Sequence, residues 1–119
     1  MKSKSIMPKK RINSRQKGAA AEREVANILT SKNLCARRGQ QFSGGTDSPD
    51  VVCTELPTVH FEVKRVQAGN LYSWWEQAVR DAGAKNPIVV HRKNGKPWVA
   101  IMSFDLALDL LKERELNSL

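Results

Sequence analysis

Apolar residues recur along this chain with two different spacings, and the change of spacing separates helices from strands. Between residues 14 and 32 they recur every three or four positions, which predicts a helix with Ser14 as its N-cap. Further helices are predicted over 71–82 and 104–115, the latter with Ser103 as its cap. Short apolar runs predict strands over 34–38, 51–54, 59–65, 87–92 and 97–102.

The predicted elements follow the order α-β-β-β-α-β-β-α, which indicates an α/β domain with a mixed sheet flanked by helices. Asn94-Gly95 lies between the last two apolar runs and predicts a hairpin, because both residues tolerate positive φ. The sequence contains no internal repeat, and no boundary follows the first 13 residues. We therefore expect residues 14–119 to form a single domain.

Positive charge is concentrated at the start of the chain. The formal net charge is +8, and seven Lys and Arg residues precede Gly18 with no acidic residue among them. Residues 1–13 are therefore predicted to form a flexible basic arm that favours nucleic-acid phosphates. A tail that serves only solubility is the alternative. The cations expected to face DNA are Lys9, Lys10, Arg11, Arg15, Lys17, Arg23, Arg37 and Arg38.

Hydropathy and cysteine usage disfavour several other classes of protein. No apolar run is long enough to span a membrane, and no apolar signal-peptide segment follows the basic start, so we expect a cytoplasmic protein without membrane contact. Cys35 and Cys53 have no CxxC partner, which disfavours a zinc site. Both lie in apolar runs, so they are predicted to be buried, reduced thiols.

The candidate chemistry lies in two neighbouring apolar runs. Side chains alternate between the faces of a strand, so Glu62 and Lys64 share one face while their apolar neighbours point into the core. If the two runs pair, Asp50 joins them. Two carboxylates persist together most readily around a hard cation, so the pattern predicts a divalent-metal site beside a lysine, which suits phosphodiester hydrolysis. The alternatives are a solvated strand face and, for Asp50, ordinary turn chemistry after Pro49.

Two further residues are expected near this group. Glu22 falls at the edge of the apolar stripe of the first helix, which tilts it toward the protein body, where a carboxylate needs a partner. A surface carboxylate paired with a basic residue is the alternative. His60 shares the strand face of Glu62 and Lys64, and we interpret it as a structural histidine rather than a ligand.

Several short motifs match a known family in their order along the chain. They are Lys17-Gly18, Glu22-Arg23-Glu24, Arg37-Arg38, Ser43-Gly44-Gly45, Pro49-Asp50 and Glu62-Val63-Lys64. With this order of elements, the chain resembles the PD-(D/E)xK nuclease superfamily and, within it, the archaeal-type Holliday junction resolvases that also occur in phages. The resemblance is densest between residues 17 and 64, and it implies a restriction-endonuclease-like fold.

The resemblance also implies roles for individual residues. It places the metal ligands on Asp50, Glu62 and the main-chain carbonyl of Val63, with Mg²⁺ as the ion and Mn²⁺ as a substitute. It adds Glu22 and Ser43 to the catalytic residues, while loop polarity alone is the alternative explanation of Ser43. Lys64 would orient the nucleophile or stabilise charge developing on the phosphate. No small-molecule cofactor is implied.

The expected function is hydrolysis of DNA phosphodiesters at four-way junctions by a metal-dependent endodeoxyribonuclease that works as a homodimer. The last helix offers more apolar surface than one face requires, which is consistent with burial against another subunit. Trp74 and Trp75 cannot both occupy the centre of a core stripe, so one is expected at a rim, an interface or a DNA surface. Gln77, on the same helix, is a weak candidate for an approach to the site. The alternatives are a general endonuclease acting on other DNA structures and a non-catalytic basic DNA-binding protein.

Overall fold

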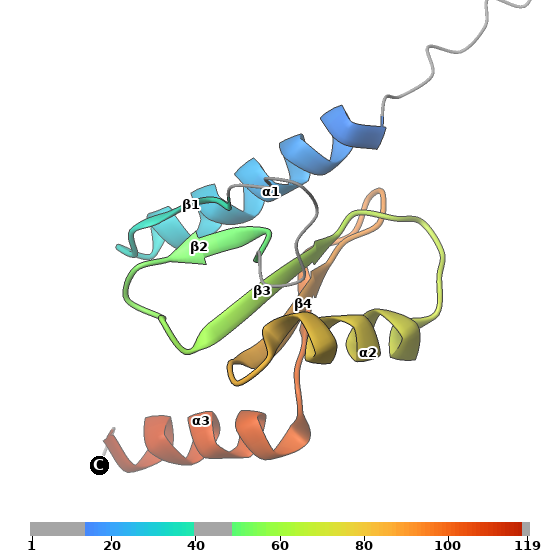
Figure 1. Cartoon of the computed structure of the whole chain (residues 1–119). Helices are drawn as coiled ribbons and strands as arrows, with labels where there is room; N and C mark the ends of the chain where they lie inside the picture. Colours follow the sequence, from blue (N-terminus) through green and yellow to red (C-terminus); the bar gives the residue numbers. More distant parts are fainter. Residues whose placement is uncertain (1–13, 40–48, 118–119) are drawn as a thin grey trace, which may run out of the picture.

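A mixed five-stranded sheet with helices packed on it forms the body of the molecule (Figure 1). The computed structural model describes residues 14–39 and 49–117. The predicted order of elements and the α/β architecture with a mixed sheet are confirmed. The elements are α1 (Ser14–Ser31), β1 (Ala36–Arg38), β2 (Val51–Cys53), β3 (Val59–Lys64), α2 (Leu71–Ala82), β4 (Asn86–His91), β5 (Val99–Ile101) and α3 (Phe104–Asn117).

The strands lie in the order β1-β2-β3-β4-β5, so each strand pairs with its neighbours in the sequence. Only β3 and β4 run parallel, with Glu62 opposite Val89 and Lys64 opposite His91. A parallel pair needs a crossover, and α2 supplies it. The other described pairs are antiparallel. Helix α1 contacts β1, β2 and β3, whereas α2 contacts β3 and β4, so β3 is covered by both helices.

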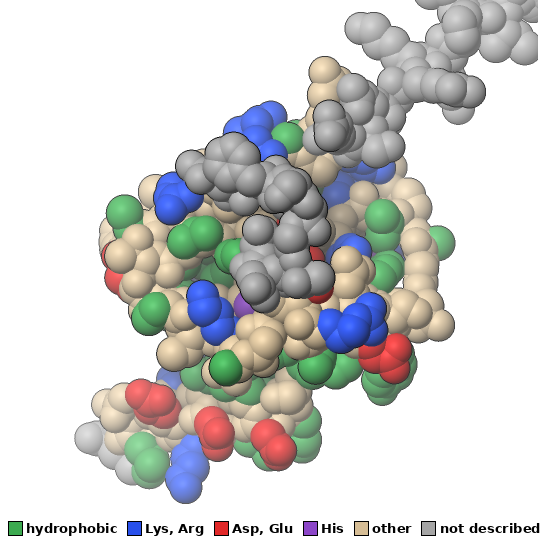
Figure 2. Space-filling view, viewed as in Figure 1, with side chains coloured by type: hydrophobic (Ala, Val, Ile, Leu, Met, Phe, Trp, Pro, Cys, Tyr) green, Lys and Arg blue, Asp and Glu red, His purple; other side chains and the backbone are tan. Residues whose placement is uncertain are grey.

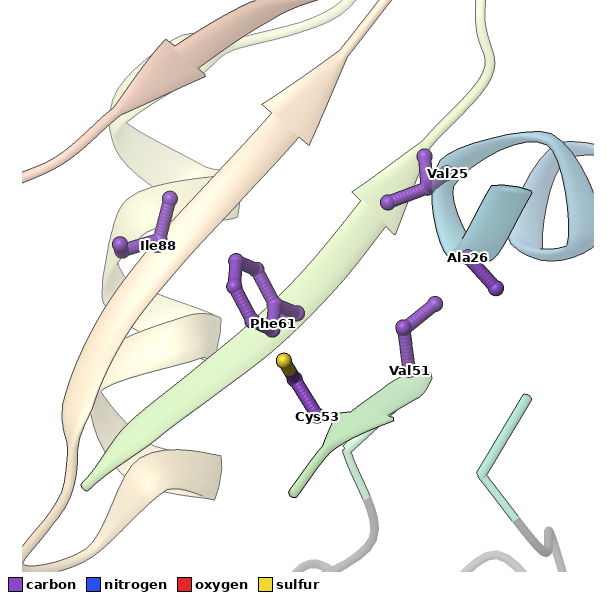
Figure 3. Packing of buried hydrophobic residues seen from close by; sticks show 6 residues of the cluster. All are labelled: Val25, Ala26, Val51, Cys53, Phe61 and Ile88. Atoms are coloured by element: carbon purple, nitrogen blue, oxygen red, sulfur yellow. The ribbon is translucent and has the colours of Figure 1, made fainter. Parts of the chain in front are cut away.

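The hydrophobic core lies between α1 and the sheet. Val25 and Ala26 of α1 belong to one buried cluster with side chains of β2, β3 and β4, and Figure 3 shows Val25 pointing toward them. Strand alternation puts Phe61 and Ile88 on this side and turns Glu62 and Val89 to the other. The buried cluster consists of Val25, Ala26, Val51, Cys53, Phe61 and Ile88.

The start of β2 is fixed by a close approach between two stretches of backbone. The Gly39 N–H donates to the Asp50 carbonyl oxygen at 2.8 Å. A Cβ atom on residue 39 would lie 1.9 Å from the Pro49 carbonyl oxygen, so only glycine fits without moving the backbone. The two ends of the segment 40–48 are therefore joined immediately before the first candidate metal ligand.

Helix α2 begins and ends at the predicted residues. The Asn70 side chain accepts from the Ser73 N–H at 3.1 Å and caps its first turn. Trp74 packs over Gly69, where an added Cβ would lie 2.4 Å from the indole ring, and its ring centroid lies 4.6 Å from that of His91. Trp74 and Trp75 are both half-buried, so the expectation that one of them lies at a rim holds for each.

Helix α3 makes little contact with the rest of the chain. It lies below the sheet in Figure 1, and no residue in it is buried. Leu106 packs against the core cluster, but Phe104 is 76% exposed and Leu111 is 54% exposed. The surplus of apolar surface predicted for this helix is therefore present. Acidic side chains also lie over α3 in Figure 2.

One local prediction was wrong. Cys35 is exposed, because it lies just before the edge strand β1 rather than beneath α1, whereas Cys53 is buried as predicted. In the hairpin between β4 and β5 only Gly95 has a positive φ, of 74°, so Asn94 does not use the left-handed conformation. The hairpin itself is confirmed by the antiparallel pairing of β4 with β5.

Candidate active site

Asp50 is tied to β3 through both its backbone and its side chain. Its N–H donates to the Phe61 carbonyl oxygen at 3.0 Å, and its Oδ2 accepts from the Val63 N–H at 2.8 Å. The expected pairing of the two apolar runs therefore exists, and it sets the Asp50 carboxylate beside the strand that carries Glu62 and Lys64. Asp50 is more than a turn residue, because its carboxylate bonds to a neighbouring strand.

Glu62 is buried rather than solvated, with 6% of its surface exposed. Its Oε1 lies 2.7 Å from His60 Nε2, and the His60 side chain is 2% exposed. The alternative of an ordinary solvated strand face is therefore wrong for Glu62. A buried carboxylate requires a partner, and His60 supplies one from the same face of β3.

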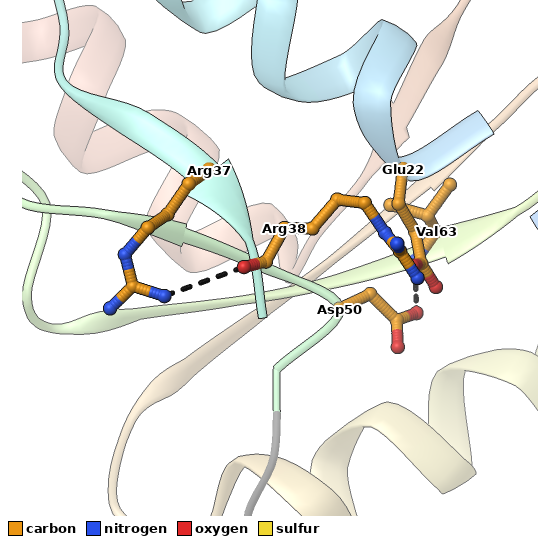
Figure 4. Close-up of polar contacts among 5 residues, drawn as sticks. All are labelled: Glu22, Arg37, Arg38, Asp50 and Val63. Atoms are coloured by element: carbon orange, nitrogen blue, oxygen red, sulfur yellow. Dashed lines mark hydrogen bonds and ion pairs between the residues drawn. The ribbon is translucent and has the colours of Figure 1, made fainter. Parts of the chain in front are cut away.

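Glu22 lies on α1 and reaches the same region. It is 9% exposed, and its Oε1 accepts from Arg38 Nε at 3.0 Å. Figure 4 shows Arg38 extending from β1 toward Glu22, with Asp50 and Val63 close by. The predicted tilt of Glu22 toward the protein body is confirmed, and Arg38 is the partner that its burial requires.

The proximity of three carboxylates perturbs the first of them. The pKa of Asp50 is raised from 3.8 to about 7, mainly by burial and then by the negative charge of Glu62, with a smaller contribution from Glu22, against the lowering effect of the Val63 hydrogen bond. Carboxylates grouped in this way favour a positive charge between them. The donor set thus fits a hard divalent cation, for which carboxylate and carbonyl oxygens are the usual ligands.

The carboxylates are nevertheless engaged with other groups. Asp50 bonds to Val63, Glu62 to His60, and Glu22 to Arg38. Within residues 14–39 and 49–117, no three His, Cys, Asp or Glu side chains converge as a ready metal site. Asp50, Glu62 and the Val63 carbonyl remain the groups that would hold an ion.

Lys64 lies two residues after Glu62 and therefore on the same face of β3. Its Nζ donates to Gln77 Oε1 at 3.3 Å, which connects the motif on β3 to α2. The weak indication that Gln77 approaches the site is therefore confirmed. An amide that accepts from the ammonium can hold its direction without neutralising its charge.

The cations expected to face DNA are only partly described. Lys17 is half-buried on α1, Arg23 is exposed, and Arg37 is exposed on β1 with Nη1 3.4 Å from the Arg38 carbonyl oxygen. Arg15 lies in α1, but its side chain is outside the described part. The remaining predicted site residues lie outside the described residues: Lys9, Lys10, Arg11 and Ser43.

With this geometry, the chain can be compared with known proteins. A family model described as "Phage putative PDDEXK endonuclease" matches residues 13–117. The chain belongs to this family. Among solved structures, this PDDEXK endonuclease is similar to Hjc, a Holliday junction resolvase from the archaeal hyperthermophile Archaeoglobus fulgidus, at 25% identity and a TM-score of 0.51. The match covers 72% of each chain. No curated protein gives a significant match.

Sequence reasoning missed the other side of this PDDEXK endonuclease's site. Arg65 directly follows the motif, and Arg92 lies at the end of β4, yet neither was identified. Arg65 could have been found from its position one residue after Lys64. Arg92 could not, because its approach to β3 depends on the parallel pairing of two strands that are far apart in the sequence.

No helix in the described part is long and apolar enough to cross a membrane.

Proposed function

We propose that this chain is a divalent-metal-dependent endodeoxyribonuclease that cuts four-way DNA junctions. The observation that carries the proposal is the convergence of Asp50 and Glu62 on adjacent strands, with Lys64 one step beyond. The family match supports endonuclease activity. The similarity to Hjc, itself a Holliday junction resolvase, supports branched DNA as the substrate.

Each residue has a separate task in the proposed reaction. A divalent ion, Mg²⁺ with Mn²⁺ as a substitute, would lower the pKa of a water molecule and offset charge on the phosphate. Asp50, Glu62 and the Val63 carbonyl would hold it. Lys64, directed by Gln77, would orient the nucleophile or stabilise the developing charge. Glu22, held by Arg38, would position water or a second ion.

The proposed working form is a homodimer. One site cuts one strand at a time, whereas resolution of a junction needs two symmetric cuts, which a two-fold dimer provides. Helix α3 is the proposed interface, because Phe104, Leu108, Leu110 and Leu111 are all exposed on it. The acidic residues of the same helix disfavour contact with DNA. Residues 1–13 are proposed as a basic arm that reaches the DNA.

A panel of labelled DNAs tests the proposal. Four-way junctions, flaps, duplex and single strands of matched sequence are incubated with the protein in Mg²⁺ or in EDTA. We expect paired cuts in the junction in Mg²⁺ and no cuts in EDTA. Preferential cutting of flaps or duplex ends would replace the junction with a more general endonuclease function. If no DNA is cut in Mg²⁺ or Mn²⁺ while binding persists, the protein is a non-catalytic DNA-binding protein.

A further inference from the structure

Two cavities adjoin between the first half of α1 and the ends of β3 and β4. One has a volume of about 460 Å³ and is lined by residues that include Lys17, Val63 and Lys64. The other has a volume of about 450 Å³ and reaches Arg92 and Asn94. Lys17, Ala21 and Arg65 line both, so the two form one continuous depression, called here the α1–β3 groove.

The α1–β3 groove is strongly positive. Its charged lining residues include three cations and one carboxylate, with a net charge of +2, besides Lys64, whose ammonium is directed to Gln77 of α2: Lys17, Arg65, Arg92 and Glu24. The carboxylate is already engaged, because Glu24 Oε1 accepts from Arg92 Nη1 at 2.5 Å and from Trp98 Nε1 at 2.6 Å. A ligand that neutralises the groove must therefore bring its own negative charge.

Two arginine nitrogens in this groove lack the hydrogen bonds that their burial requires. Among the described residues, Arg65 Nη1 and Arg92 Nε are the buried side-chain nitrogen or oxygen atoms without a partner. A buried, unpaired N–H of a charged group is costly, so a small shift of either guanidinium that lets its N–H reach an acceptor in the groove would relieve that cost. Both arginines line the same cavity.

Both arginines are held in place by other contacts. Arg65 Nη2 donates to Asn94 Oδ1 at 2.7 Å, and the Asn94 N–H donates to Gln67 Oε1 at 3.0 Å. The Arg92 guanidinium lies 5.9 Å from the centre of the Trp98 ring. These contacts hold both guanidinium groups at the groove before a ligand arrives. Arginines held this way suit phosphate, which accepts several hydrogen bonds at once.

We propose that the α1–β3 groove binds a backbone phosphate of the cleaved DNA strand, next to the scissile phosphate, with Arg65 and Arg92 as its ligands. The proposal rests on the proposed nuclease function. The groove begins at Val63 and Lys64 in the candidate active site. Arg92 is directly adjacent to it, since its N–H donates to the Lys64 carbonyl oxygen at 3.1 Å. The groove thus sets the path of the strand as it leaves the site.

Binding of junction DNA in EDTA, where no strand is cut, measures this contact. Arg65→Gln is expected to weaken binding about tenfold, the effect of one charged hydrogen bond. The slope of log affinity against log salt should fall by about 0.9 for one lost phosphate contact. Lys85→Gln removes an equal charge from the exposed turn before β4 and should change neither value. Equal effects of the two substitutions would overturn the proposal.

Modified DNA tests the groove without altering the protein. A neutral methylphosphonate is placed at each phosphate flanking the scissile one. We expect one position to weaken wild-type binding about tenfold and to leave Arg65→Gln binding unchanged. If no flanking position weakens binding by wild-type protein that still cuts junctions, the proposed phosphate site in the groove is wrong and the nuclease function stands. If one flanking position weakens binding by a protein that cuts no DNA, the proposed phosphate site holds and the nuclease function is wrong.

Discussion

His60 and Glu62 lie on the same face of β3, with His60 Nε2 2.7 Å from Glu62 Oε1, and both side chains are buried. The contact explains how a carboxylate is retained inside the sheet. His60→Phe fills similar space but leaves Glu62 without this partner, so it is expected to destabilise the protein by about 2 kcal/mol. Chemical denaturation measures the change. Glu62→Gln added to His60→Phe should recover part of the loss, and additive effects would contradict a direct interaction.

Replacement of either candidate metal ligand should abolish the chemistry and spare binding. Asp50→Asn and Glu62→Gln are expected to lower the cleavage rate at least about a thousandfold, because each removes a charge that holds the ion. Junction affinity in EDTA should remain close to that of the wild type. Gel-based cleavage and fluorescence anisotropy measure the two properties. Full cutting by Asp50→Asn protein in Mg²⁺ would contradict the site assignment.

The pKa of Asp50, about 7, predicts that stability falls as pH rises. Below pH 4 the carboxyl is protonated in both folded and unfolded chains. Between pH 4 and 7 the unfolded chain ionises while the folded chain keeps its proton, so the folded state loses stability. Without metal, Asp50→Asn should therefore be more stable than the wild type by about 2 kcal/mol at pH 8, and nearly equal to it at pH 4.

Metal addition supplies the control for that pH experiment. Mg²⁺ should raise the melting temperature of the wild type at pH 8, since a cation between the carboxylates offsets their repulsion. Asp50→Asn protein should gain much less, and EDTA should reverse the wild-type gain. Equal shifts in the two proteins would show that Mg²⁺ acts somewhere other than at Asp50.

Deletion of residues 1–13 should weaken DNA binding and reduce its dependence on salt. The deletion removes Lys2, Lys4, Lys9, Lys10 and Arg11. If all five neutralise phosphates, the log–log salt slope falls by about four to five units. A titration series between low and physiological salt measures the slope. An unchanged slope would show that the arm does not contact DNA, and would favour a role in solubility alone.

A charge on α3 should separate the proposed dimer. Leu110 is 48% exposed, and Leu110→Glu is expected to give monomers that make single nicks and lose paired cutting. Trp75→Glu tests whether the half-buried tryptophan on α2 belongs to the interface as well. Lys112→Glu also adds negative charge to α3, but at a polar position, and should leave the dimer intact. Light scattering with and without junction DNA measures the assembly, and a wild-type monomer in both states would remove the proposal.

Local patterns were sufficient to predict most of the fold. Helix α2 has the predicted bounds, and the structure shows why: Asn70 caps its start, and Gly83, with a φ of 59°, follows its last residue. Both signals lie within a few residues of the helix that they delimit. The motif on β3 was equally local, and strand alternation placed Phe61 in the core as predicted.

Properties that depend on packing were not predictable in the same way. The burial of Glu62 follows from the crossing of α2 behind β3, which no local pattern specifies. The exposure of Cys35 follows from its place beside the sheet edge. The proximity of Arg65 and Arg92 was not predictable either. They are 27 positions apart along the chain, and the parallel pairing of β3 with β4 brings them together.

The backbone contact at Gly39 fixes the position of Asp50 independently of the length of the segment before it. Because the Gly39 N–H bonds to Asp50, and Pro49 leaves no room for a side chain at residue 39, the two ends of the segment 40–48 stay together whatever its composition. Changes of length between those ends would therefore leave the aspartate in its place directly before β2. For a protein engineer the segment is an insertion point next to the candidate site, provided that Gly39 and Ser43 are kept.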